Sequence, residues 1–99
     1  MGILNKSIFS ISPVGSHTRI ASVTSATTIT IPQNASGIIM QASAANVFYT
    51  IDGSTPTTAT RFILNSSGSP TRIDLYPGAT IKVISPTGEL NYQFFRVEV

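Results

Sequence analysis

The sequence contains no cysteine, no tryptophan and only one histidine in 99 residues. Without thiols the chain can form neither a disulfide nor a thiolate metal site. Charged residues make up only 10% of the chain, against about 25% in an average soluble domain. The six basic residues are scattered along the chain, whereas nucleic-acid binders gather such residues on one face or stripe. We therefore expect no nucleic-acid partner.

Groups suited to catalysis or metal binding are also scarce. The only acids are Asp52, Asp74, Glu89 and Glu98, and the only histidine is His17. General acid–base catalysis needs two carboxylates or a carboxylate with a histidine, and metal sites need several ligands close together. The sequence has no nucleophile-elbow motif and no glycine-rich nucleotide motif. We therefore expect no enzyme activity, no catalytic residue, no metal and no cofactor, and we interpret His17 as an ordinary surface or interface histidine.

Long apolar runs are missing as well. No segment approaches the roughly 20 apolar residues that a membrane span needs. The opening stretch "MGILNKSIF" lacks the sustained apolar core of a secretory signal. Lys6 stands where an N-myristoylation motif has Ser or Thr. These features predict a protein made in the cytoplasm with no membrane partner.

Hydroxyl groups take the place of charges, because the chain has 13 Ser and 13 Thr beside 41% hydrophobic residues. Hydroxyls keep a surface hydrated, and they pack against another protein at a lower desolvation cost than Lys or Glu. The composition therefore suits a surface that lies against neighbouring proteins. It is equally typical of a threonine-rich β protein without that role.

Short runs of β-branched and aromatic residues lie between 7 Gly and 6 Pro, which is the pattern of strands separated by turns. Alternation puts Ile29 and Ile31 on one face, and Val47, Tyr49 and Ile51 on one face. The sequence thus predicts an all-β fold, an antiparallel β-sandwich or jelly roll of eight or so short strands. The expected strands are residues 7–12, 19–24, 27–31, 37–43, 46–51, 60–65, 72–76, 80–85 and 91–99.

Turn residues support the same division. Asp52-Gly53 supplies the positive φ that a tight hairpin requires, and Pro77-Gly78 suits the central pair of a type II turn. No stretch of helical length shows the spacing of an amphipathic helix. The chain is too short for more than one domain.

The first part of the chain is less regular than the rest. Residues 1–26 are expected to form an N-terminal arm and the first strands, and residues 27–99 the β-sandwich core of a single domain. An arm that leaves the core would reach along a neighbour. The apolar residues expected to contact a neighbour or a shell are Ile3, Leu4, Ile8, Phe9 and Ile11. The alternative is that they form a first core strand.

Two resemblances meet in the middle of the chain. The segment "FYTIDGSTPT" (Phe48–Thr57) resembles a strand–turn–strand segment in small Ig-like C-terminal modules of chitobiases and related polysaccharide-degrading enzymes. That resemblance implies carbohydrate binding. Sugar sites usually stack the sugar on exposed aromatic rings, so glycan binding that is lost on replacement of Tyr49 or Tyr76 would support this alternative.

The second resemblance covers about residues 27 to 97. A threonine-rich strand ending in Ile-Pro, then "GIIMQA", "ANVFYTIDGSTPT", "IKVIS" and a closing aromatic strand follow one another in an order similar to small virion proteins of tailed bacteriophages. The resemblance implies a non-enzymatic structural protein, most simply a capsid decoration (cement) protein. It would bind and stabilise the shell of major capsid proteins, as a homo-oligomer with a trimer favoured, and would be located in the virion. A tail or neck position and a carbohydrate-binding module are the alternatives.

Overall fold

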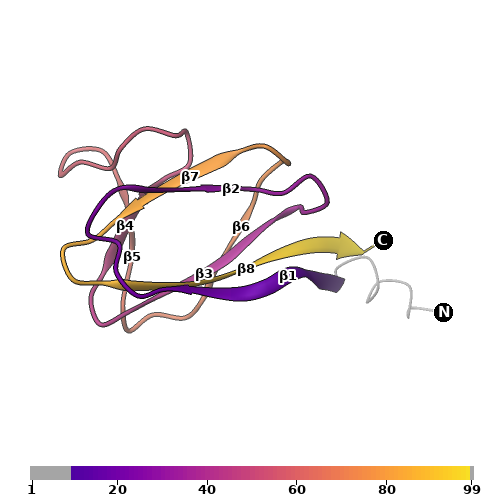
Figure 1. The fold of residues 1–99 in the computed structure, drawn as a ribbon, viewed down its shortest axis with the longest axis horizontal. Coiled ribbons are helices and arrows are strands. Elements are labelled where there is room, and N and C mark those ends of the chain that lie inside the picture. The colour runs from indigo at the N-terminus through magenta and orange to yellow at the C-terminus, as the bar shows by residue number, and fades with distance from the viewer. Residues whose placement is uncertain (1–9, 99) are drawn as a thin grey trace.

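Residues 10–98 are described in the structure, a computed structural model, and they form antiparallel strands without a helix (Figure 1). In this part of the chain no helix is present that could cross a bilayer. The strands are β1 (Ser10–Ile20), β2 (Thr27–Thr30), β3 (Gly37–Ser43), β4 (Val47–Thr50), β5 (Phe62–Leu64), β6 (Thr71–Asp74), β7 (Thr80–Ile84) and β8 (Glu89–Glu98).

The strands form two four-stranded sheets that pack face to face. One sheet has the order β1-β8-β3-β6 and the other the order β2-β7-β4-β5. Every connection except β4–β5 therefore crosses from one sheet to the other, which is the arrangement of an eight-stranded jelly roll. The prediction of an all-β antiparallel sandwich of this type is confirmed.

The core follows the predicted period of two. Ile29 and Ile31 are buried at one end of β2, and Ile81 and Val83 are buried on β7. Their neighbours in sequence point to the other side, because successive side chains of a strand alternate between faces. Each fully buried aliphatic side chain of this size contributes about 1.5–3 kcal/mol to folding. Packing of the two inner faces is therefore what holds the sheets together.

Strand β4 ends one residue earlier than the predicted strand 46–51. Val47 is fully buried and Tyr49 packs partly against the core, but Ile51 is 41% exposed. The strand stops at Thr50, and Thr50 is buried because its hydroxyl donates a hydrogen bond to the backbone carbonyl of Ser54. The prediction that Ile51 faces the core is thus wrong, because the chain turns before Ile51 can continue the alternation.

The prediction of two short strands near the N-terminus is also wrong. β1 runs without interruption along β8, and a shift in register between Val14 and Thr18 takes up the irregular sequence. Gly15 adopts a φ of +73° within that shift, as in a β-bulge. Pro13 is tolerated because β1 lies at the edge of its sheet. The part of the N-terminal region from residue 10 to residue 20 therefore belongs to the sandwich.

Candidate functional site

The residues predicted to contact a partner are only partly placed by the structure. Ile11 lies on the edge strand β1 and is 39% exposed. It is therefore accessible to a neighbour, as the prediction requires. The other four, Ile3, Leu4, Ile8 and Phe9, lie outside the described residues, and their role stays a prediction.

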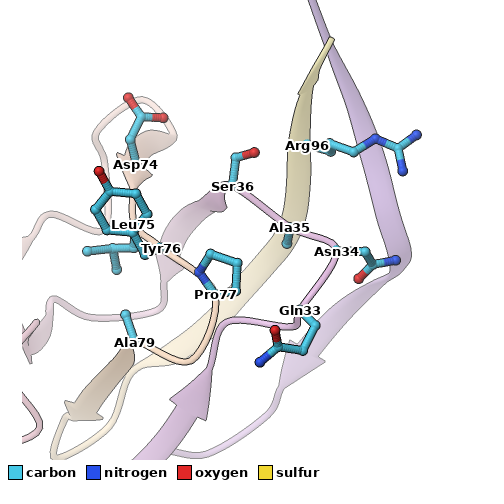
Figure 2. Close-up of a pocket in the computed structure, with 10 residues that line it drawn as sticks. All are labelled: Gln33, Asn34, Ala35, Ser36, Asp74, Leu75, Tyr76, Pro77, Ala79 and Arg96. Atoms are coloured by element: carbon cyan, nitrogen blue, oxygen red, sulfur yellow. The ribbon is translucent and has the colours of Figure 1, made fainter.

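A pocket of about 830 Å³ opens at one end of the sandwich, where the β2–β3 connection meets the β6–β7 connection (Figure 2). Its walls are residues 33–36 on one side and residues 74–79 on the other, with Arg96 of β8 beside them. We call it the Tyr76 pocket. The two walls are far apart in sequence, so only the folded sandwich brings them together.

A tight turn shapes the Tyr76 side of the pocket. The backbone N–H of Ala79 donates to the carbonyl of Tyr76 at 3.1 Å, and Gly78 has a φ of +89°. Pro77 and Gly78 are thus the central residues of a turn with positive φ at its third position, as in type II. The prediction from the Pro-Gly pair is confirmed.

Backbone hydrogen bonds join the two walls. The Ile31 N–H donates to the Ala79 carbonyl, and the Gly78 N–H donates to the Ile31 carbonyl, both at 2.9 Å. On the other side of the pocket, the Leu75 N–H donates to the Ser36 carbonyl at 2.9 Å. Because these bonds are between main-chain atoms, the shape of the pocket does not depend on flexible side chains.

The lining combines an aromatic ring with paired charges. Tyr76 is 88% exposed. The Asp74 carboxylate accepts a hydrogen bond from Arg72 Nε at 2.9 Å, and Arg96 Nε donates to the Glu98 carboxylate at the same distance. Figure 2 shows the guanidinium of Arg96 extending away from Tyr76. The pocket therefore carries no unbalanced charge.

Two side-chain amides complete the opposite wall. Gln33 and Asn34 are exposed on the β2–β3 connection. Within residues 10–98 neither amide has a hydrogen-bond partner. Each amide offers two donor hydrogens and one acceptor oxygen. The pocket thus has unused hydrogen-bonding groups on one wall and an exposed ring on the other.

A second feature is an apolar surface at the β5 edge of the other sheet. Phe62 is 57% exposed, Ile63 is 51% exposed and Ile51 is 41% exposed. Ile51 and Phe62 line one depression, whereas Ile63 follows Phe62 on the strand and points to the opposite face of the sheet. We call these three residues the β5 edge patch, which exposes apolar groups on both faces of the edge. β5 is the last strand of its sheet and pairs only with β4, so one side of its backbone is open. Figure 1 shows β5 toward the left of the molecule and the connections of the Tyr76 pocket toward the right.

Aromatic contacts hold the surroundings of the patch in place. The rings of Tyr49 and Phe62 lie 5.5 Å apart between centroids, and the guanidinium of Arg61 lies 3.8 Å from the centroid of Phe48. Burial raises the pKa of the Tyr49 hydroxyl above its ordinary value. Tyr49 is therefore partly buried and packs against both the core and Phe62.

The Asp52-Gly53 segment is a turn within the β4–β5 connection. Asp52 Oδ1 accepts hydrogen bonds from the Ser54 hydroxyl at 2.6 Å and from the Ser54 N–H at 3.0 Å. These two bonds lower the pKa of the Asp52 carboxyl below its ordinary value. Gly53 has the predicted positive φ, +87°. The turn is not a tight hairpin, because the connection runs from residue 51 to residue 61 before β5 begins.

His17 and the remaining acids form no catalytic group in the described residues. His17 Nε2 lies 3.1 Å from Asn91 Oδ1 on the exposed face of β1 and β8. Glu89 pairs with Arg19 at 2.7 Å, and that partner lowers the pKa of the Glu89 carboxyl. No three metal-binding side chains come together among residues 10–98.

Comparison with protein-family models, with curated proteins and with solved structures finds no match to this chain. Function therefore has to be inferred from the geometry of its surfaces. The sequence placed Tyr76 at the end of the expected strand 72–76 and did not predict a pocket beside it. Its position directly before Pro77-Gly78 was the available signal, because a residue that begins a protruding turn is readily exposed.

Proposed function

We propose that the chain is a non-enzymatic structural protein of a tailed-bacteriophage virion, most simply a capsid decoration protein that adheres to a shell of major capsid proteins. The observation that supports it best is the β5 edge patch. Ile51 and Phe62 are exposed apolar residues that line one depression beside an open strand edge. Ile63 follows Phe62 on β5, so it exposes a further apolar side chain on the opposite face of the sheet. Exposed apolar groups of this kind mark protein contact sites when they cluster.

The mechanism is adhesion by repetition. One patch of three apolar side chains is too small to hold a partner tightly, because stable interfaces bury about 800 Å² on each side. A shell presents the same contact many times, and linked copies gain avidity without any new contact. A homo-oligomer, with a trimer favoured, would bring several patches to one shell position. Ile11, on the edge strand β1 of the other sheet, and the predicted contact residues before Ser10 would make a second, separate contact.

The proposal is tested by co-sedimentation of the purified chain with shells assembled from the major capsid protein of the same phage. Phe62→Asp is expected to lower association at least about tenfold, since it places a charge in an apolar contact. Thr28→Asp is the matched control, because Thr28 is exposed on β2, the other edge strand of the same sheet. Ile51→Asp should repeat the loss, because Ile51 and Phe62 line the same depression.

Two further measurements complete the test. Light scattering after size exclusion reports the oligomeric state, with three copies expected. Antibody labelling of intact particles reports the position, and label on the shell is expected. Label confined to the tail or neck would replace the decoration role with the alternative. Shell association that is absent, or that is equally strong in Phe62→Asp and Thr28→Asp, would refute the adhesive role of the patch.

A further inference from the structure

The Tyr76 pocket is a second site, and it shares no residue with the β5 edge patch. Its volume of about 830 Å³ lies within the roughly 300–1,000 Å³ typical of small-molecule sites. The bonds of Ile31 to Gly78 and Ala79 and of Leu75 to Ser36 fix both walls through the backbone. A ligand would therefore enter a site that needs little reorganisation, which lowers the cost of binding.

Tyr76 is the most exposed of the large hydrophobic side chains in the described part of the chain, at 88%. Its hydroxyl has no hydrogen-bond partner there. The ring packs against no core, so it adds nothing to the stability of the sandwich by burial. An aromatic face held by a rigid turn at the mouth of a pocket offers a flat apolar platform with a polar edge.

Polar groups surround this platform. Only one oxygen of the Asp74 carboxylate is engaged by Arg72, so the other can accept a hydrogen bond. The amides of Gln33 and Asn34 on the opposite wall are both unpartnered within residues 10–98. Together the groups supply donors and acceptors in the lining of the pocket that Tyr76 borders.

The charged residues of the pocket make anions such as phosphate, and divalent cations, unsuitable as ligands. Asp74 is balanced by Arg72, and Arg96 is balanced by Glu98. A phosphate would lie beside the Asp74 carboxylate, which would repel it. A divalent cation would find a single carboxylate in the lining of the pocket, whereas calcium takes six to eight oxygen ligands. The lining suits a ligand that is neutral, carries many hydroxyls and has one apolar face.

We infer that the Tyr76 pocket binds a neutral carbohydrate, with the C–H face of a sugar ring on Tyr76 and its hydroxyls on Asp74, Gln33 and Asn34. This inference does not depend on the proposed virion role. It also does not depend on the segment from Phe48 to Thr57, which lines no part of the pocket.

The test is a titration of the full chain, labelled with ¹⁵N, with neutral disaccharides and, separately, with inorganic phosphate. The disaccharides are maltose, cellobiose, lactose and diacetylchitobiose. At least one of them is expected to shift the backbone amides of residues 33–36, 74–76, 78 and 79 and the side-chain amides of Gln33 and Asn34. Phosphate is expected to shift none of these signals.

Single-residue variants test whether the sugar stacks on the Tyr76 ring or touches the surface without a defined site. Tyr76→Ala should weaken binding of the responding sugar by about tenfold or more, the effect of losing a central aromatic contact. Tyr76→Phe should retain most of the affinity, because it keeps the ring. Asn34→Ala should weaken binding, whereas Asn65→Ala, an exposed asparagine on the β5–β6 connection, should not.

Three outcomes would overturn the inference. They are the absence of any shift with all four sugars, shifts of equal size in Tyr76→Ala, and shifts with phosphate in place of the sugars. Because Tyr76 and Asn34 are exposed, their variants should unfold at the temperature of the parent chain. A loss of sugar binding can then be assigned to the pocket itself.

Discussion

Ser85 is expected to be the most important hydroxyl for stability in the described part of the chain. It is fully buried at the end of β7. Its Oγ donates to the Asn46 carbonyl at 2.6 Å and accepts from the Gly88 N–H at 2.9 Å. One hydroxyl thus joins the β3–β4 turn to the β7–β8 turn. Ser85→Ala removes both bonds and adds no new group that could replace them.

The loss of stability expected for Ser85→Ala follows from the two backbone groups that lose their hydrogen-bond partner. The Gly88 amide is buried, and a buried donor without a partner costs about 2 kcal/mol. The Asn46 carbonyl is only partly buried, so losing its bond costs about 1 kcal/mol. The sum, about 3 kcal/mol, is a large part of the roughly 5–15 kcal/mol that stabilises a domain of this size. The expected fall in Tm is about 12–24 °C.

Urea unfolding followed by far-UV circular dichroism measures the loss, and hydrogen exchange locates it. The Gly88 amide should exchange faster in Ser85→Ala than in the parent chain, because it loses its acceptor. Ser67→Ala is the control, since Ser67 is exposed and its hydroxyl has no partner in the described residues; it should change stability by less than about 0.5 kcal/mol. A loss below about 1 kcal/mol for Ser85→Ala would show that water or a local shift replaces the hydroxyl, and would refute the calculation.

Three further changes test the backbone and the charges. A Cβ on Gly37 would lie 2.2 Å from the Ile73 carbonyl oxygen, so Gly37→Ala should cost about 3 kcal/mol in urea unfolding; an unchanged midpoint would contradict this. Ala44 has a φ of +71°, so Ala44→Gly should raise stability by about 1 kcal/mol, and any loss would count against strain there. The lowered pKa of Glu89 means that its ionised form adds stability at neutral pH, and that this is lost as pH falls below its ordinary value of 4.5. Glu89→Gln should therefore flatten the fall in Tm on acidification, and an unchanged pH profile would argue against a role for Arg19.

The strands were predictable because their pattern is local. Ile81 and Val83 alternate with polar residues, and their side chains are buried as the period of two requires. The Gly-rich and Pro-rich punctuation also placed the turn at Pro77-Gly78. β1 was harder to predict, because Pro13 and Gly15 normally end a strand. Only pairing with β8 shows that a bulge on an edge strand can absorb both residues.

The sites could not be predicted in the same way, because their members come together only in the folded chain. Asn34 and Tyr76 are separated in sequence by the four strands β3 to β6. Backbone bonds between Ile31 and the β6–β7 turn bring them to one pocket. Phe62 was expected within a strand that serves the core. Its exposure follows from the position of β5 at the edge of the sheet, and strand order is not written in a local pattern.

The hydroxyl-rich composition has a different meaning in the structure from the one that it suggested. Several Ser and Thr hydroxyls form hydrogen bonds with backbone groups in the loops between strands. Ser85 joins two turns, Thr50 bonds within the β4–β5 connection, Thr57 Oγ1 accepts two N–H groups there, and Ser36 Oγ accepts from the end of β8. Since these hydroxyls are already engaged, they have less to offer a partner. The proposed adhesion therefore rests on the β5 edge patch, where large apolar groups are exposed. The proposed ligand binding rests on the Tyr76 pocket, whose two side-chain amides have no partner in residues 10–98.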